Sequence, residues 1–165
     1  MDRSPLQIVT YPNPTLRMKA EAVRRFDGDL VRLVDGMFAV MRRAGGCGLA
    51  AVQVGLPVRV LIGVDLSGRE LILVNPVVTD RQGWAEAEEN CLSVPCVSGR
   101  VGRASRVSVE AVDVLGRLAQ VDLSGMLARI VQHEIDHLDG ILFLDRIVSP
   151  SVSRETPSPD VRSAA

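Results

Sequence analysis

The sequence predicts an α+β fold in which short antiparallel or mixed sheets surround a central helix near the carboxyl end of the chain. An amphipathic helix is expected early in the chain, several short β-branched segments follow it, and a second amphipathic helix comes after them. These helices and strands do not alternate regularly, which disfavours a parallel doubly wound sheet.

The composition indicates one globular domain with no strongly charged partner. The chain has 165 residues, of which 47% are hydrophobic and 24% charged, enough for one substantial core. Its net charge is -1, from 19 basic and 20 acidic residues, so we expect no binding of nucleic acid or membranes. The first nine residues lack the apolar run of a secretion signal, which predicts a cytoplasmic location. We expect a catalytic domain at residues 1–147 and a disordered tail, rich in Ser and Pro, at residues 148–165.

The early helix and the strands follow from the spacing of apolar residues. The helix is expected at residues 29–43 and should end at the glycines that follow. Its apolar face would consist of Leu30, Val34, Met37, Phe38 and Met41. Residues 58–64 and 71–74 are rich in β-branched side chains and are predicted to pair as strands. Residues 107–111 and 118–121 are predicted to form a second pair.

The second helix is expected to begin at residue 123 or 124 and to run to Leu138, with Gly140 placed to end it. Its buried face would carry Met126, Ile130, His133 and His137, at steps of four, three and four residues.

This helix contains a His-Glu-x-x-His motif at residues 133–137. The spacing puts two imidazoles one turn apart on one side of a helix with the glutamate beside them, which suits a divalent metal. His133 and His137 are the only histidines in the sequence, so an interpretation as ordinary core histidines fits less well.

A catalytic metal usually takes three protein ligands, so a third must come from a cysteine, an aspartate or a glutamate elsewhere. Cys91 lies in a segment typical of a loop or an edge strand, but a lone cysteine is by itself a weak signal.

Three motifs, in order, resemble the peptide deformylase family, and the resemblance extends from about Gln7 to Ile147. The family pattern Gly-x-Gly-Leu-Ala-Ala-x-Gln matches residues 46–53, Glu-Gly-Cys-Leu-Ser matches residues 89–93, and Gln-His-Glu-x-x-His matches residues 132–137. The resemblance implies that the protein removes the formyl group from formyl-methionine at the N-terminus of nascent polypeptides. The implied partner is a formylated peptide or nascent chain, with transient contact to the ribosome.

The resemblance also implies roles for individual residues. Cys91, His133 and His137 would bind one divalent metal, typically Fe²⁺ in this family and readily replaced by Zn²⁺ or Ni²⁺. Such a metal would lower the pKa of a bound water from about 15.7 to about 7 and supply hydroxide for attack on the formyl carbon. Glu134 would pass the proton of this water to the leaving amine. The side-chain amide of Gln53 and the backbone N–H of Leu92 would stabilise the charge that develops on the formyl oxygen.

Substrate contacts are expected around these residues. The resemblance puts Cys47 and Gly48 on the edge that binds the peptide, while Met126 and Ile130 are candidates for the pocket wall or for the plain core. Arg103 would anchor the peptide or a loop, or would be a surface arginine.

One departure from the family pattern lies beside a candidate ligand. Asn90 stands where the family has glycine. Should that position require a positive φ, asparagine is among the least costly replacements, and its side chain would line the substrate groove beside Cys91.

Several alternatives remain open. A related hydrolase could act on another N-acyl or formylated small molecule with the same metal and glutamate. A non-catalytic homologue would need neither Glu134 nor Gln53, and a zinc protease would fit Cys91 poorly. Cys47 and Cys96 are left as free thiols, and for Cys96 we expect a half-buried, inert state.

Overall fold

The computed structural model describes residues 6–151 and contains two α-helices, three short 3₁₀-helices and eight strands within that range. In chain order the elements are η1 (Pro14–Arg17), α1 (Gly28–Arg43), β1 (Gly48–Ala50), η2 (Ala51–Val54), β2 (Val60–Val64), β3 (Glu70–Gln82), β4 (Ala85–Cys91), β5 (Val94–Arg103), β6 (Arg106–Val112), β7 (Leu118–Ser124), α2 (Gly125–Leu138), η3 (Phe143–Asp145) and β8 (Ile147–Ser151).

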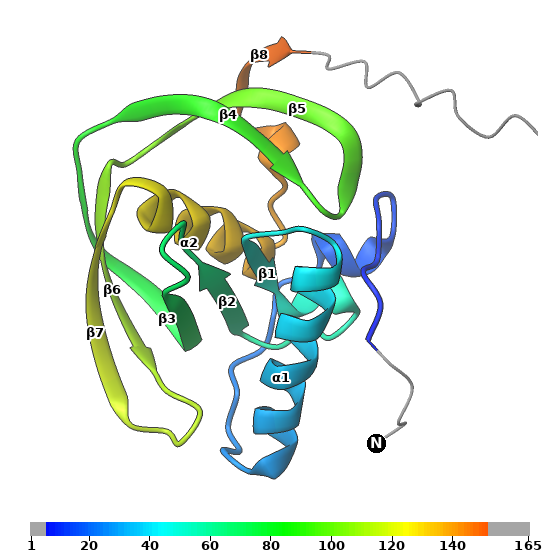
Figure 1. The fold of residues 1–165 in the computed structure, drawn as a ribbon, viewed down its shortest axis with the longest axis vertical. Coiled ribbons are helices and arrows are strands. Elements are labelled where there is room, and N and C mark those ends of the chain that lie inside the picture. Colours follow the sequence, from blue (N-terminus) through cyan, green and yellow to red (C-terminus); the bar gives the residue numbers. More distant parts are fainter. Residues whose placement is uncertain (1–5, 152–165) are drawn as a thin grey trace, which may run out of the picture.

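The strands form two antiparallel sheets with α2 between them. The larger sheet has the order β1-β2-β3-β6-β7 and the smaller has the order β4-β5-β8. Figure 1 shows β4 and β5 passing over α2, with α1 beside β1 on the other side of the molecule. The main core lies between α2 and the larger sheet, a second core joins α1 to β1 and β2, and a small third cluster lies under β4 and β5.

Helix α1 follows from its sequence. The Asp27 carboxylate caps its N-terminus by accepting hydrogen bonds from the backbone N–H groups of Asp29 and Leu30. Its last turn carries Arg42 and Arg43, which favour the negative end of the helix dipole. All five apolar residues predicted for the inner face are buried, and so is Val40.

Helix α2 ends where the sequence predicts. Gly140 has φ 75°, and a Cβ at this position would lie 2.6 Å from the carbonyl oxygen of Arg17, so glycine is required on both counts. The helix is buried on most of its circumference, because the larger sheet packs on it and side chains of β4 and β5 contact its polar residues from the smaller sheet. Met126 does not belong to the buried face as expected, since it is 40% exposed at the start of the helix.

One long antiparallel ribbon connects the two sheets. The pair Gln82↔Arg106 of β3 and β6 continues as Ala85↔Arg103 of β4 and β5, so the register is kept across the corner. Gly83 turns this corner with φ 66°. The ribbon therefore begins in the larger sheet and carries β4 over α2.

The predicted α+β class and both predicted strand pairs are confirmed. Strands β1, β4, β5 and β8 were not predicted, although Cys91 was expected in a loop or an edge strand and ends the edge strand β4. The domain boundary expected after Ile147 falls inside β8, which pairs with β5 as far as Ser151, so residues 148–151 belong to the fold. The rest of the expected tail, residues 152–165, lies outside the described residues.

Neither α1 nor α2 is long and apolar enough to cross a membrane, and the same holds for every other helix within residues 6–151.

Asn75 fastens the segment between η1 and α1 to the irregular part of β3. Its side chain accepts a hydrogen bond of 2.8 Å from the Val23 N–H and donates one of 2.9 Å to the Val23 carbonyl. Its φ of 53° lies in the left-handed region, which asparagine tolerates better than most residues.

We predict that Asn75→Ala lowers the free energy of unfolding by about 3 kcal/mol, from two lost hydrogen bonds and the cost of a left-handed alanine. Asn75→Asp keeps the acceptor and tolerates this backbone conformation, so it should lower that free energy by only about 1 kcal/mol. Denaturant unfolding of both variants measures the difference, and equal losses would contradict the assigned role of the backbone conformation.

Candidate metal centre

The two histidines of α2 lie side by side beneath the smaller sheet. His133 and His137 are 8% and 1% exposed, and their ring centroids are 5.0 Å apart. One helical turn separates them, so both rings leave the same side of α2, as the sequence predicts.

Cys91 approaches these rings from the end of β4. Its Sγ lies 3.2 Å from Nε2 of His137, and the candidate donor atoms of Cys91, His133 and His137 all lie within 4.8 Å of one another. The structure thus brings together the three residues that the sequence predicts as ligands. One thiolate and two imidazoles form a donor set that Zn²⁺ and Fe²⁺ accept, and three protein ligands leave a further coordination position open.

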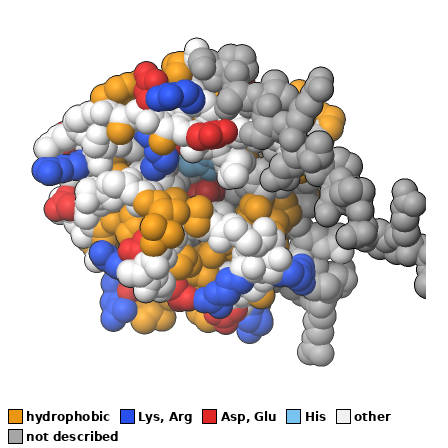
Figure 2. Space-filling view, turned by 45° about the horizontal axis from the view of Figure 1, so that its top comes forward, with side chains coloured by type: hydrophobic (Ala, Val, Ile, Leu, Met, Phe, Trp, Pro, Cys, Tyr) orange, Lys and Arg blue, Asp and Glu red, His pale blue; other side chains and the backbone are white. Residues whose placement is uncertain are grey.

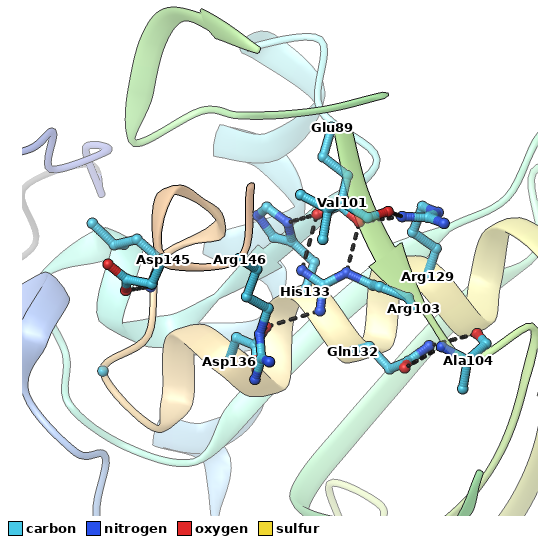
Figure 3. A network of polar contacts seen from close by, with 12 residues as sticks. Glu89, Val101, Arg103, Ala104, Arg129, Gln132, His133, Asp136, Asp145 and Arg146 are labelled. Carbon is cyan, nitrogen blue, oxygen red and sulfur yellow. Dashed lines mark hydrogen bonds and ion pairs between the residues drawn. The ribbon is translucent and has the colours of Figure 1, made fainter. Parts of the chain in front are cut away.

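Glu89 holds the ring of His133 in place. Its Oε2 lies 2.9 Å from His133 Nδ1 and accepts a second hydrogen bond, also of 2.9 Å, from Arg103 Nη2. Its Oε1 accepts hydrogen bonds of 2.6 Å from Arg103 Nε and from Arg129 Nη1. Figure 3 shows these groups converging on Glu89. All four acceptor positions of the carboxylate are therefore in use.

These contacts determine the ionisation of the pair. Burial alone would raise the pKa of Glu89, but hydrogen bonds from His133 and Arg103 outweigh it and bring that pKa to about 2. Because an ionised carboxylate can only accept, Nδ1 of His133 must donate, and Nε2 then remains for a metal. Burial also disfavours a charge on His133, yet its contacts with Cys91 and Glu89 raise its pKa to about 10. Metal binding must therefore displace a proton from this ring.

Glu134 lies next to the candidate ligands with an unused acceptor. Glu134 is buried and lines a cavity beside the ligands. Its Oε2 has no hydrogen-bond partner among residues 6–151. Burial raises its pKa to about 7, against the opposing charges of His133 and Arg103. A carboxyl group with this pKa can exchange a proton at neutral pH.

The amide hydrogens of Gln53 point toward the candidate ligand Cys91. Its Oε1 accepts a hydrogen bond of 2.8 Å from the backbone N–H of Ala50, which can only donate, so the orientation of the amide is fixed. Nε2 then lies 3.5 Å from Cys91 Sγ and 3.2 Å from Ser93 Oγ. Leu92 lies in the turn between β4 and β5, at the wall of the cavity.

A cavity of about 690 Å³ opens over these groups, within the usual size range for small-molecule sites. Its walls include the sequence-predicted residues Cys47, Gly48, Asn90, Met126 and Ile130. Figure 2 shows a hollow with histidine and acidic surface inside and hydrophobic side chains along one side. The backbone at Gly48 lies close to the candidate proton carrier, because a Cβ there would lie 2.4 Å from Glu134 Oε1.

Arg103 lies outside the cavity. It is 4% exposed, does not line the cavity, and pairs with Glu89 and Asp136 behind the metal-binding residues. It is therefore neither a surface arginine nor placed to touch a peptide, and of the expected roles only the anchoring of a segment agrees with its position.

The structure also bears on Asn90 and Cys96. Asn90 is not among the described non-glycine residues with positive φ, so its extended backbone is one that any residue adopts. Cys96 is exposed rather than half-buried, and it has a φ of 63°. Cys47 is exposed as well, and both of these free cysteines line the cavity.

Glu89, Arg129 and Asp136 were not among the predicted site residues. Glu89 and Asp136 belong to the recognised motifs, but only the fold shows that the Glu89 carboxylate bonds a ligand histidine and that Asp136 bonds Arg103. Arg129 precedes His133 by one helical turn, and this spacing is the one signal in the sequence that could have indicated it.

Comparisons with known proteins agree with this geometry. A model of the polypeptide deformylase family matches residues 5–153. The chain is 45% identical to a peptide deformylase of Thermodesulfovibrio yellowstonii over 147 residues, which cover 86% of this chain and 88% of that protein. It is also 45% identical to the chloroplastic peptide deformylase 1B of Oryza sativa, over 87% of this chain and 55% of that protein.

Solved structures give the same result. A plant peptide deformylase matches with a TM-score of 0.86 and 40% identity, covering 90% of this chain and 83% of the other. The peptide deformylase of Thermus thermophilus matches with a TM-score of 0.81 and 45% identity, covering 85% and 84%.

The contacts of Glu89 predict that Glu89→Gln weakens Zn²⁺ binding about 10–100-fold, because the supporting partner of a ligand histidine loses its charge. Glu86→Gln is the matched control, since Glu86 lies on the same strand in an exposed ion pair with Arg100. Competition with a chromophoric chelator measures both affinities. Equal affinity in Glu89→Gln and the parent would contradict the role given to Glu89.

Proposed function

The chain belongs to the polypeptide deformylase family, and we propose that its cavity deformylates the formyl-methionyl terminus of nascent polypeptides with one divalent ion held by Cys91, His133 and His137. It is a peptide deformylase, a metal-dependent hydrolase, and its fold is the deformylase-like α+β fold expected from the sequence. The observation that carries the proposal is the convergence of one thiol and two imidazoles, within 4.8 Å of one another, next to Glu134.

The ion adds one element of chemistry to the site. A divalent metal bound by such ligands lowers the pKa of a coordinated water from about 15.7 to about 7. Fe²⁺, Zn²⁺ and Ni²⁺ all accept these donors, and the resemblance to the family favours Fe²⁺. The tautomer that Glu89 imposes on His133 supports binding of the ion through Nε2.

Glu134 is the proposed proton carrier. Its Oε2 is free to accept a proton from the attacking water and to deliver it to the amine as the C–N bond breaks. The formyl group then leaves as formate, and the peptide keeps a free N-terminus. Burial raises the pKa of Glu134 and so favours the protonated form that delivers the proton to the amine.

Gln53 and Leu92 are the proposed donors to the formyl oxygen. The Gln53 Nε2 group faces the cavity because its oxygen is already bonded to Ala50, and Leu92 carries a backbone N–H in the turn after Cys91. Donors already in position stabilise the charge of the tetrahedral intermediate without rearrangement, an effect worth a factor of about 10²–10³ in rate for each.

The cavity lies between two sheet edges, which supports binding of an extended peptide. Strand β1 is the edge of the larger sheet and β4 the edge of the smaller one, and Gly48 and Asn90 on these strands line the cavity. Apolar surface for a methionine side chain comes from Met126, Ile130 and the Cβ of Cys47.

A cytoplasmic location and transient contact with the ribosome remain predictions. The relative from Oryza sativa is chloroplastic, so the family as such does not fix the compartment.

The direct experiment supplies formyl-Met-Ala-Ser to protein purified without oxygen and measures free amine. We expect deformylation that a chelator abolishes and added Fe²⁺ or Zn²⁺ restores. Acetyl-Met-Ala-Ser and formylated small amines are the comparison substrates, and a preference for either over the formyl peptide would overturn the proposed substrate.

Two variants separate metal binding from proton transfer. We predict that Glu134→Ala keeps the metal but loses about 10²–10⁴-fold in kcat, because only the proton carrier is removed. His133→Ala should lose both the metal and the activity, because a ligand is removed. Metal analysis and the formyl-peptide assay give both results, and a fully active Glu134→Ala enzyme would refute the assignment.

A further inference from the structure

Arg129 bonds three groups at once from the cavity side of α2. Its Nη1 donates to Glu89 Oε1 at 2.6 Å and to the Val101 carbonyl at 2.9 Å, and its Nη2 donates to the Ala85 carbonyl at 2.6 Å. The side chain is 18% exposed and forms part of the cavity wall. Figure 3 shows it reaching Glu89 from the side opposite His133.

These bonds tie both strands over α2 to the helix. Ala85 is the first residue of β4, and Val101 lies on β5, paired with Ala87 of β4. Strand β4 is an edge strand with a backbone partner on one side only. One guanidinium from α2 therefore replaces part of the support that a second neighbouring strand would give.

The position of β4 decides the geometry of the metal centre. Cys91 ends this strand, and Glu89, two residues earlier, bonds the ring of His133. Any shift of β4 relative to α2 therefore moves one ligand and the support of another. Loss of such supporting contacts typically costs about 10–100-fold in metal affinity or activity.

Arg103 and Arg129 share Glu89 but differ in what else depends on them. Arg103 is buried and pairs with both Glu89 and Asp136, so its loss would take one cation away from two buried acids at once and threaten folding. Arg129 is partly exposed, Glu89 keeps Arg103 and His133 as partners without it, and the Ala85 carbonyl belongs to an exposed residue. Its loss should therefore loosen the site without unfolding the protein.

We propose that Arg129 is a positioning residue that fastens β4 to α2 and thereby sets the distance between Cys91 and the two imidazoles. This inference rests on the metal site of the proposed function, and it adds a residue that neither touches the ion nor takes part in proton transfer. Because Arg129 also lines the cavity, the contact path from the cavity wall through Glu89 to His133 is continuous.

The test compares Arg129→Met, Arg129→Lys and the control Arg100→Met. Methionine keeps apolar bulk but no donors, whereas lysine keeps the charge and can reach only part of the acceptor set. Arg100 joins the same two strands through an exposed ion pair with Glu86 at 3.7 Å and does not line the cavity. Zn²⁺ affinity by chelator competition, the absorption spectrum of the Co²⁺-loaded protein, and thermal unfolding of the metal-free protein are measured for each.

For Arg129→Met we expect Zn²⁺ affinity to fall about 10–100-fold and the Co²⁺ spectrum to change. Arg129→Lys should recover part of the affinity, and Arg100→Met should match the parent in both measurements. An Arg129→Met protein that binds Zn²⁺ within about twofold of the parent, or a loss shared by Arg100→Met, would overturn the proposal. Should Arg129→Met fail to fold, Arg129→Gln is judged by the same criteria.

The parent protein separates this inference from the proposed function. If the parent chain does not bind metal at Cys91, His133 and His137, the proposed function fails. If the parent binds and the Arg129 variants bind equally well, only the role of Arg129 fails.

Discussion

The buried carboxylate of Glu89 is the interaction on which the geometry of the centre depends. It receives hydrogen bonds from β5, through Arg103, and from α2, through Arg129 and His133. Burying such ions contributes little net stability, because desolvation offsets most of the attraction. The arrangement instead fixes the orientation of the His133 ring. A carboxylate with a pKa of about 2 stays an acceptor and so determines which nitrogen of His133 faces the other ligands.

For Glu89 to reach His133, the ribbon of β3–β6 and β4–β5 must cross α2, and its backbone must bend to do so. The register of β3 with β6 continues into β4 with β5 around a corner at Gly83. Beside this corner Trp84 covers Gly102 so closely that a Cβ on Gly102 would lie 1.9 Å from its ring. Two glycines therefore let the ribbon bend and pack, and the bend brings Cys91 to histidines that follow much later in the chain.

The sequence predicts the parts of this structure that local patterns determine. The apolar spacing of α1 and the His-Glu-x-x-His motif of α2 are helical periodicities, and both were found as predicted. Strand β4 was not predicted because residues 85–91 are mostly acidic or small. An edge strand that no second sheet covers needs no alternation of apolar and polar residues. The burial of Arg103 depends on Glu89 and Asp136, 14 and 33 residues away in the chain, and no local pattern carries that information. Met126 was wrongly predicted to be buried. It lies in the first turn of α2, where the helix reaches the mouth of the cavity, so a position on the inner face of the helix is not buried there.

Two carboxylates in this centre differ because their surroundings differ. Every acceptor position of Glu89 is filled by a cationic or ring donor, so its charge is stabilised and it cannot take part in proton exchange near neutral pH. Glu134 is as well buried, but its Oε2 has no partner among the described residues and its pKa rises to about 7. Gln53 is held at both ends, since its oxygen accepts a hydrogen bond from Ala50 and its amide nitrogen donates to Cys91 Sγ and Ser93 Oγ. To reach a formyl oxygen, that amide must exchange one of these two contacts. Groups whose hydrogen bonds the protein satisfies hold the site in shape, and those it leaves unsatisfied toward the cavity are the ones available to a substrate.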